Sequence, residues 1–340
     1  MRVSAYSILL ILLLFPESDL RAEDLYSGSA PVSDQSPAQR QSAMPESLKQ
    51  VLQKISGLTV FDEYPQVQPA LATAGSMAIS FSYRTRERLL PDGTVENELL
   101  LVTNFAPRAV DDLVKELQLP LWKSERRPVT LWFLVDDGVG RRIMPIEFQQ
   151  EFDSMAQVAA DRGLPVRVPI ADEEGGFAVD PQLLWGGFTE ELQESGPVDA
   201  LVVAAGRDGP EWNVRMTLDY GSVDWSSRQR GIRLVDVLVQ AMNEAINEVA
   251  ASQSIAAADL GQSIYSLTVS GVLTSADYVR CLNYLQSLSL VNEVAVVSAR
   301  PGQVQFNLAL AATPQYLLSS FESDGVLFPT AVEGEFSMIP

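Results

Sequence analysis

Strand-like and helix-like segments alternate between residues 129 and 252, and this alternation constrains the fold more than any other feature of the sequence. Apolar runs typical of strands lie at 129–135, 164–170, 198–205, 212–220 and 222–229. Amphipathic segments typical of helices lie at 147–162, 181–194 and 234–249. Helices between the first strands indicate parallel pairing, whereas the last two strands are close enough to form a meander. The pattern predicts an α/β unit with both parallel and antiparallel strands.

A smaller α+β unit is predicted before this one, over residues 23–122. Its expected elements are a strand at 25–32, a helix at 37–57, a short helix at 64–73, a hairpin with strands at 78–90 and 94–105, and a helix from Pro107. A Pro-Asp-Gly turn at 91–93 joins the two hairpin strands. Pro45 interrupts the helical pattern, so we expect it to kink or split the first long helix.

A third unit is predicted over residues 260–329. Its expected elements are strands at 264–271, 291–300, 303–311 and 326–328, with helices at 275–288 and 314–322. This βαββαβ order is ferredoxin-like. Polar stretches at 119–128 and 250–262 are interpreted as linkers that proteases would cut first, which sets the middle unit at 127–252. Residues 330–340 are expected to form a loose tail.

The first residues indicate export from the cytoplasm. The stretch MRVSAYSILLILLLF has one positive charge, at Arg2, followed by an apolar run that is short for a membrane span. These are the properties of a signal peptide, and a small residue at Ala22 suits cleavage before Glu23. A buried helix is the alternative interpretation of the same run. We expect residues 1–22 to be removed and the mature chain to be periplasmic.

The composition limits the chemistry that the chain can perform. The sequence contains no histidine, so the usual general base and the commonest transition-metal ligand are absent. The net charge of −20 argues against nucleic acid as a partner, because phosphate binding relies on clusters of lysine and arginine. No later run is long and apolar enough for a transmembrane segment. We expect no cofactor, no metal and no catalytic residue.

The stretch VDDGVGRR, at 135–142, is the one that most resembles a site for a metal ion or a nucleotide phosphate. It lacks the third glycine of a dinucleotide-binding fingerprint, and adjacent strand residues such as Asp136 and Asp137 point to opposite faces. We therefore interpret it as a strand end and a glycine turn. Consecutive acids at 172–174 do not have the alternating spacing of a calcium loop and are interpreted as a solvated loop.

For two further features, a structural role in packing is favoured over a catalytic or ligand-binding role. Cys281 shares a helical face with Leu285 and Leu288, so we expect a buried structural thiol. The four residues Trp185, Gly186, Gly187 and Phe188 form the candidate binding surface. The two glycines weaken a helix there. They permit close backbone packing or, alternatively, a groove lined by aromatic side chains.

Several pieces of the chain resemble one family in their order and spacing. They are DQSPAQRQSAMPESLKQVLQKISG, LPLWKSERRPVTLWFLVDDGVGRR, RGLPVRVPIAD, WGGF, DALVVAAGRDGPEWNVRMTLD and LTVSGVLTSADYVRCLNYLQSL. The family is the bacterial secreted proteins of domain of unknown function 2066, whose members tend to continue the helix where this chain has Pro45. The resemblance implies a proteobacterial envelope protein and supplies no catalytic residues. The middle unit also looks similar to the amino-terminal domain of the translocation protein TolB and to envelope lipoproteins that activate peptidoglycan synthases, all of which are binding modules.

Taken together, these features favour a periplasmic binding or scaffold module of the cell envelope, whose partners are other envelope proteins. The alternative is a hydrolase of glycans that uses carboxylates such as Asp136 or Glu174, because paired carboxylates perform acid–base catalysis without histidine.

Overall fold

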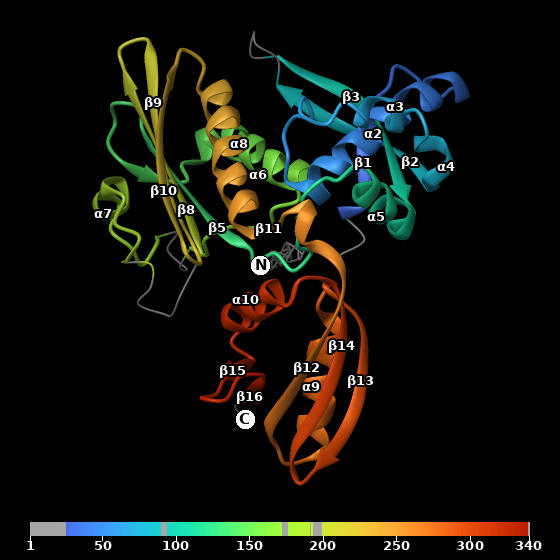
Figure 1. Ribbon diagram of the computed structural model, residues 1–340. Coiled ribbons are helices and arrows are strands. Elements are labelled where there is room, and N and C mark those ends of the chain that lie inside the picture. Colours follow the sequence, from blue (N-terminus) through green and yellow to red (C-terminus); the bar gives the residue numbers. More distant parts are fainter. Residues whose placement is uncertain (1–24, 90–93, 172–175, 191, 193–198, 339–340) are drawn as a thin grey trace, which may run out of the picture.

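The computed structural model describes residues 25–89, 94–171, 176–190, 192 and 199–338. Three mixed units follow one another along the chain, and each combines a sheet with helices (Figure 1). The mixed α/β and α+β class predicted from the sequence is confirmed at this level. The expected signal peptide at 1–22, the turn at 91–93 and the acidic cluster at 172–174 lie outside the described residues.

The N-terminal unit contains a three-stranded antiparallel sheet in the order β1-β3-β2. Its elements are β1 (Ser27–Pro31), α2 (Pro37–Ser56), α3 (Val67–Leu71), α4 (Ala74–Met77), β2 (Ala78–Leu89), β3 (Val95–Phe105) and α5 (Pro107–Glu116). The expected split at Pro45 is wrong, because α2 runs through it as one helix. Leu48 and Val51 are fully buried on the face of α2 that packs into the core, and this burial offsets the hydrogen bond that proline removes.

The middle unit contains a mixed sheet in the order β10-β9-β8-β5-β6. Its elements are β5 (Val129–Asp136), β6 (Arg142–Ile143), the 3-10 helix η1 (Ile146–Phe148), α6 (Gln149–Arg162), β7 (Val166–Arg167), α7 (Pro181–Gly186), β8 (Ala200–Asp208), β9 (Glu211–Tyr220), β10 (Val223–Gly231) and α8 (Leu234–Gln253). Strand β5 pairs parallel with β8 and β7, whereas β8, β9 and β10 pair antiparallel. The predicted mixture of parallel and antiparallel strands is confirmed.

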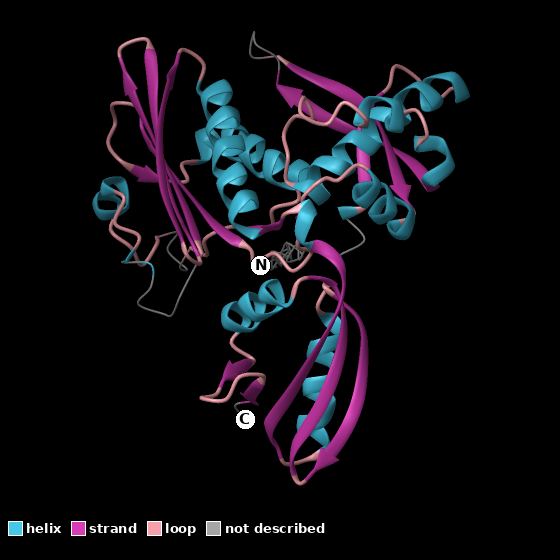
Figure 2. Ribbon diagram, in the orientation of Figure 1, coloured by secondary structure: helices cyan, strands magenta, loops and turns pink. Residues whose placement is uncertain are grey.

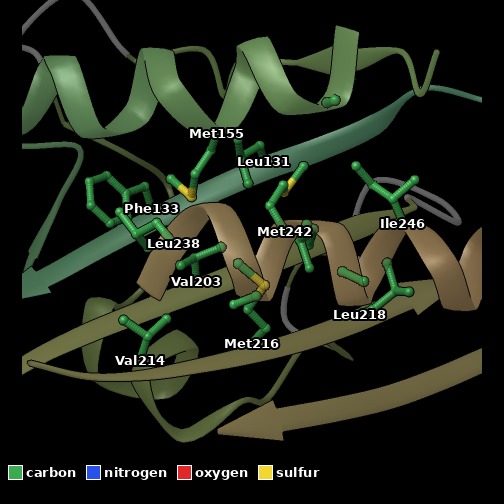
Figure 3. Close-up of a cluster of buried hydrophobic side chains, with 14 of the residues drawn as sticks. Leu131, Phe133, Met155, Val203, Val214, Met216, Leu218, Leu238, Met242 and Ile246 are labelled. Carbon is green, nitrogen blue, oxygen red and sulfur yellow. The ribbon is translucent and has the colours of Figure 1, made fainter. Parts of the chain in front are cut away.

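The two faces of the middle sheet are covered differently. Helices α6 and α8 pack on the inner face, where Phe133, Val203 and Met216 meet Met155 and Leu238 in a buried core (Figure 3). These helices lie on the side of the sheet that faces the N-terminal unit (Figure 2). The short helix α7 packs on the outer face, over a smaller cluster centred on buried Leu134, Leu184 and Val202.

The C-terminal unit contains a five-stranded sheet in the order β13-β14-β12-β16-β15. Its elements are β12 (Leu260–Val272), α9 (Ser275–Ser287), β13 (Val291–Arg300), β14 (Gly302–Ala312), α10 (Pro314–Asp324), β15 (Leu327–Pro329) and β16 (Glu335–Met338). The expectation of a loose tail is wrong for β16, which pairs parallel with β12 between Thr268 and Ser270. Phe336 and Met338 are buried in the core of this unit, and their burial holds the tail in place.

The stretch at 119–128 is a packed junction, so its interpretation as a flexible linker is wrong. Strand β4 (Leu121–Trp122) pairs antiparallel with β11 (Ser254–Ile255), which joins the two stretches that the sequence suggested were linkers. Trp122 is buried within the core of the middle unit. The guanidinium group of Arg126 lies over the Trp122 ring, 3.6 Å from its centroid, and donates to the carbonyl oxygens of Lys54 (2.6 Å) and Gly163 (2.7 Å).

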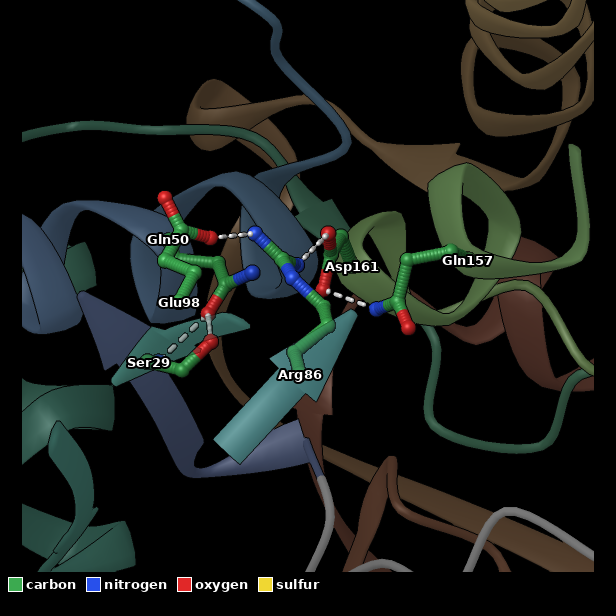
Figure 4. Close-up of polar contacts among 6 residues, drawn as sticks. All are labelled: Ser29, Gln50, Arg86, Glu98, Gln157 and Asp161. Atoms are coloured by element: carbon green, nitrogen blue, oxygen red, sulfur yellow. Dashed lines mark hydrogen bonds and ion pairs between the residues drawn. The ribbon is translucent and has the colours of Figure 1, made fainter. Parts of the chain in front are cut away.

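Further contacts connect the three units around this junction. Arg86 of β2 lies 2.6 Å from Glu98 and 3.7 Å from Asp161 of α6, which links the N-terminal and middle units (Figure 4). Ser289 of the C-terminal unit donates its hydroxyl to Glu125 at 2.7 Å. The N-terminal and middle units are therefore tied together by a direct ion pair, and the C-terminal unit is tied to the junction by the contact with Glu125.

Candidate functional site

The candidate surface at 185–188 lies on the outer face of the middle sheet. Helix α7 ends at Gly186, and Gly187 caps it in the left-handed conformation with φ 88°. A Cβ atom on Gly187 would lie 3.2 Å from the hydroxyl of Thr217 on β9, so the glycine permits close packing onto the sheet. The predicted helix over 181–194 is too long, because the two glycines end it early.

Trp185 lies between the sheet and an arginine. A Cβ atom added to Gly206 of β8 would lie 3.3 Å from the ring of Trp185, so the indole packs closely over that strand. The Arg141 guanidinium carbon lies 4.9 Å from the ring centroid, and Arg141 also hydrogen-bonds to Gln182 of α7. The structure thus brings VDDGVGRR and WGGF together, and Phe188 beside them is 55% exposed.

The two aspartates of VDDGVGRR hold the turn and have different arginine partners. Asp136 accepts the backbone N–H of Gly138 at 3.2 Å and lies 4.0 Å from Arg141. Asp137 accepts from Val139 at 3.3 Å and pairs with Arg142 at 3.1 Å. Partial desolvation acts to raise the pKa of Asp137, but the hydrogen bond from Val139 and the charge of Arg142 outweigh it and lower that pKa. The strand-end and turn interpretation is confirmed.

Arg215 and Arg228 complete the charged side of this surface. They stand directly opposite each other on the antiparallel strands β9 and β10. Burial lowers the pKa of Arg215, and the like charges of Arg228 and Arg141 lower it further. The Nη2 atom of Arg215 is buried and has no hydrogen-bond partner among the described residues. We name the group Arg141, Trp185, Phe188, Arg215 and Arg228 the arginine–aromatic face.

Among the described residues, no carboxylate neutralises this opposed pair of arginines. Like charges directly opposite each other destabilise a strand pair. In the part of the chain that the structure describes, neither Arg215 nor Arg228 forms an ion pair with a carboxylate. Arginine binds carboxylates through two parallel hydrogen bonds, and an aromatic ring beside it supplies an apolar contact. The face is therefore suited to an acidic group that is attached to an apolar or planar one.

Sequence reasoning found Trp185 and Phe188 but missed the arginines. The signal was present in the meander, because a tight turn at Gly221 and Ser222 places Arg215 opposite Arg228 once the strands are paired. The approach of Arg141 to Trp185 had no such signal. It depends on the order β9-β8-β5 within the sheet, which local patterns do not give.

The remaining sequence candidates lie apart from this face. Cys281 is buried on α9, and burial raises the pKa of its thiol to about 11, so its predicted structural role agrees with its position. Across the described ranges, no group of three or more histidine, cysteine, aspartate or glutamate side chains could hold a metal ion. None of the helices described is long and apolar enough to cross a membrane.

Comparison with known proteins gives one family match. A model described as Domain of unknown function (DUF8605) matches residues 20–123, which include the N-terminal unit and the first part of the junction. This family differs from the secreted family that the sequence resembles, and the match does not bear on that resemblance. No curated protein matches the chain.

Proposed function

We propose that the protein is a non-enzymatic binding module of the bacterial cell envelope, and that it binds an acidic segment of a partner protein through the arginine–aromatic face. One observation carries this proposal, namely the opposed pair Arg215 and Arg228 with Arg141 close by. An acidic segment would relieve the repulsion among these three cations. The ring of Phe188 would contact an apolar side chain of the same segment.

The overall charge of the protein is compatible with such a partner. At physiological ionic strength, exposed charges more than about 8 Å apart are largely screened from each other. The local arginines therefore decide which group binds at the face, whereas the net charge of −20 acts weakly at that range. An acidic segment that strayed from the arginines would be repelled, which would favour one binding position.

The cellular location belongs to this proposal. It rests on the signal-like stretch at 1–22 and on the resemblance to the secreted family of domain of unknown function 2066. The proposal also includes a likeness of the middle unit to the TolB amino-terminal domain and a ferredoxin-like arrangement of the last unit. Amino-terminal sequencing of the exported protein should give Glu23 as the first residue, and a sequence that still begins with Met1 would oppose export by this route.

The hydrolase alternative has no observation in its favour in the described part of the chain. Asp136 is engaged by Gly138 and Arg141, and Glu174 lies outside the described residues. Catalytic carboxylates also require one group whose pKa is raised for proton donation. Among the described residues, burial raises the pKa of Asp111 and of Asp199, and both carboxylates have structural partners, since Asp111 accepts from Tyr26 and Asp199 pairs with Arg127.

A binding measurement with a defined probe tests the proposal. Fluorescence anisotropy of a labelled glutamate-rich peptide that contains one tryptophan should rise as the protein is added, and the affinity should fall with salt. The double variant R215E/R228E should bind at least about tenfold more weakly, since hydrogen bonds to charged groups contribute roughly 1.5–3 kcal/mol each.

The matched control reverses two arginines away from the face. Arg108 and Arg300 are exposed on the N-terminal and C-terminal units, so R108E/R300E changes the net charge by the same amount. That variant should bind the peptide as the unaltered protein does. Equal weakening by both double variants would show that only net charge matters, and the proposal would then fail.

A further inference from the structure

A cavity of about 430 Å³ lies where the middle unit, the junction and the C-terminal unit meet. The junction contributes Lys123 and Arg127, and the turn between β9 and β10 contributes Ser222. The end of α8 contributes Ser252, while α10 contributes Tyr316 and Ser319. Its volume falls within the ~300–1,000 Å³ of small-molecule sites, which also prefer the boundaries between units. The cavity is separate from the arginine–aromatic face.

The residues that line the cavity are cationic or neutral and polar. Two cations and several hydroxyl groups face the space, together with the amide of Gln253, and no carboxylate is among the described residues that line it. The described lining is therefore cationic on a chain with a net charge of −20, and the nearby carboxylate of Asp199 balances Arg127 from outside the lining. Cations attract a carboxylate or phosphate, and hydroxyl and amide groups exchange hydrogen bonds with the hydroxyls of a ligand.

The two cations are held in position by the fold. Arg127 pairs with Asp199 through Nε at 3.0 Å and Nη2 at 3.1 Å, and Asp199 also accepts the N–H of Gly221 at 2.9 Å. Gly221 has φ 61°, and a Cβ atom there would lie 2.6 Å from the Arg127 Nη2 atom, so glycine favours this close approach. Lys123 is only 9% exposed, and its Nζ donates to the hydroxyl of Ser320 at 3.1 Å.

We propose that this cavity binds a small sugar that carries an anionic group, either a carboxylate or a phosphate. Lys123 and Arg127 bind the anionic group, and the serine hydroxyls and the Gln253 amide bind the sugar hydroxyls. Arg127 keeps its contact with Asp199, which lies behind it and orients it. This inference does not depend on the proposed acidic partner, because no residue is shared between the two sites.

Binding in this cavity would also connect two units. The walls come from α8 and the β9–β10 turn on one side and from α10 on the other. A ligand that contacts both sides binds the docked arrangement of the units and not a separated one. It would therefore raise the thermal unfolding temperature. At concentrations above the dissociation constant, this rise should grow with the logarithm of the ligand concentration.

Isothermal titration of the full chain with glucuronate, glucose 6-phosphate and neutral glucose tests the proposal. Saturable binding is expected for at least one anionic sugar, and neutral glucose should bind at least about tenfold more weakly. Two variants then locate the site. Lys123→Gln removes one cation, and Ser222→Trp fills the cavity from an exposed turn without altering Lys123 or Arg127. Each should weaken binding at least about tenfold.

Ser42→Trp on exposed α2 is the matched control for the added tryptophan, and it should leave binding unchanged. Thermal unfolding without ligand shows whether each variant is folded, so that loss of folding is not mistaken for loss of binding. The proposal is overturned if neither anionic sugar binds. It is equally overturned if neutral glucose binds as tightly, or if binding survives in both Lys123→Gln and Ser222→Trp.

Discussion

Two buried arginines near the junction donate to backbone carbonyl groups, and Arg162 of α6 donates also to the side-chain oxygens of Asn243 and Asn247, both at 2.9 Å. Arg126 donates to the carbonyls of Lys54 and Gly163, and Arg162 donates to the carbonyl of Gly57 at 2.7 Å. These carbonyls lie at the C-terminal ends of α2 and α6, where the helix dipole places partial negative charge. Burial lowers the pKa of Arg126 to about 9 and that of Arg162 to about 10, so both remain charged at neutral pH.

Replacing Arg126 should therefore weaken the whole molecule. Arg126→Met retains apolar bulk beside Trp122 but leaves the carbonyls of Lys54 and Gly163 without their donor. An unsatisfied buried group costs about 1–3 kcal/mol, so the free energy of unfolding should fall by roughly 2–4 kcal/mol. Urea denaturation measures this change. Arg108→Met at an exposed position should change it by less than about 0.5 kcal/mol, and equal effects of the two substitutions would refute the role given to Arg126.

Cys281 should be protected and should make stability depend on alkaline pH. The unfolded thiol ionises near its ordinary pKa of 9.0, whereas burial keeps it protonated to about 11 in the folded protein. Between these values the unfolded state binds fewer protons, so the free energy of unfolding falls as pH rises. Urea denaturation at pH 8 and pH 10.5 should show this fall, and Cys281→Ala should lessen it. Labelling of the native protein by a bulky thiol reagent should be slow, and rapid labelling would contradict burial.

At the scale of elements, Pro45 shows that packing can outweigh a local signal. Its ring and missing N–H disfavour a helix interior, yet α2 continues because Leu48, Val51, Leu52 and Ile55 are buried on one face beyond it. Pro45→Ala should restore a backbone hydrogen bond and raise the free energy of unfolding by about 1–3 kcal/mol.

Pro37 provides the control for this substitution. It occupies the first turn of α2, where the missing N–H has no helical partner to lose. Pro37→Ala should therefore change stability little, as measured by urea denaturation beside Pro45→Ala. A loss of stability in Pro45→Ala would mean that packing of the proline ring stabilises the protein more than the restored helical hydrogen bond does.

The periodic elements could be predicted from the sequence, and the shortest ones could not. Long amphipathic helices such as α8 and the alternating strands β9 and β14 have patterns that their burial reproduces. Strands β4, β11 and β16 contain two to four residues, too few to show a period. The polar appearance of the junction also concealed its burial, because Arg126 satisfies backbone carbonyls that a sequence pattern does not reveal.

At the scale of the whole molecule, the junction should resist proteolysis. The Lys123 side chain is buried and Arg126 is held by three backbone segments, so trypsin cannot extend this stretch into its active site without unfolding. Limited trypsin digestion followed by mass spectrometry should show early cuts at exposed positions such as Arg207, with 123–127 intact. First cuts within 123–127 would instead support a flexible linker. A fragment that begins at residue 127 lacks Trp122, so it should be less stable than one that begins at 119.

We propose that the protein acts by contact at the arginine–aromatic face. A photo-crosslinking phenylalanine analogue placed at Phe188 in living cells tests it most directly, because this side chain is 55% exposed and the preceding Gly187 lies close to Arg215. The same analogue at Phe328, which is 37% exposed on the C-terminal unit, is the control. We predict a discrete crosslinked product from position 188 that disappears in R215E/R228E, and no such product from position 328. A protein that stays folded and abundant but gives no product at position 188, or gives one that the charge reversal leaves unchanged, would contradict the account.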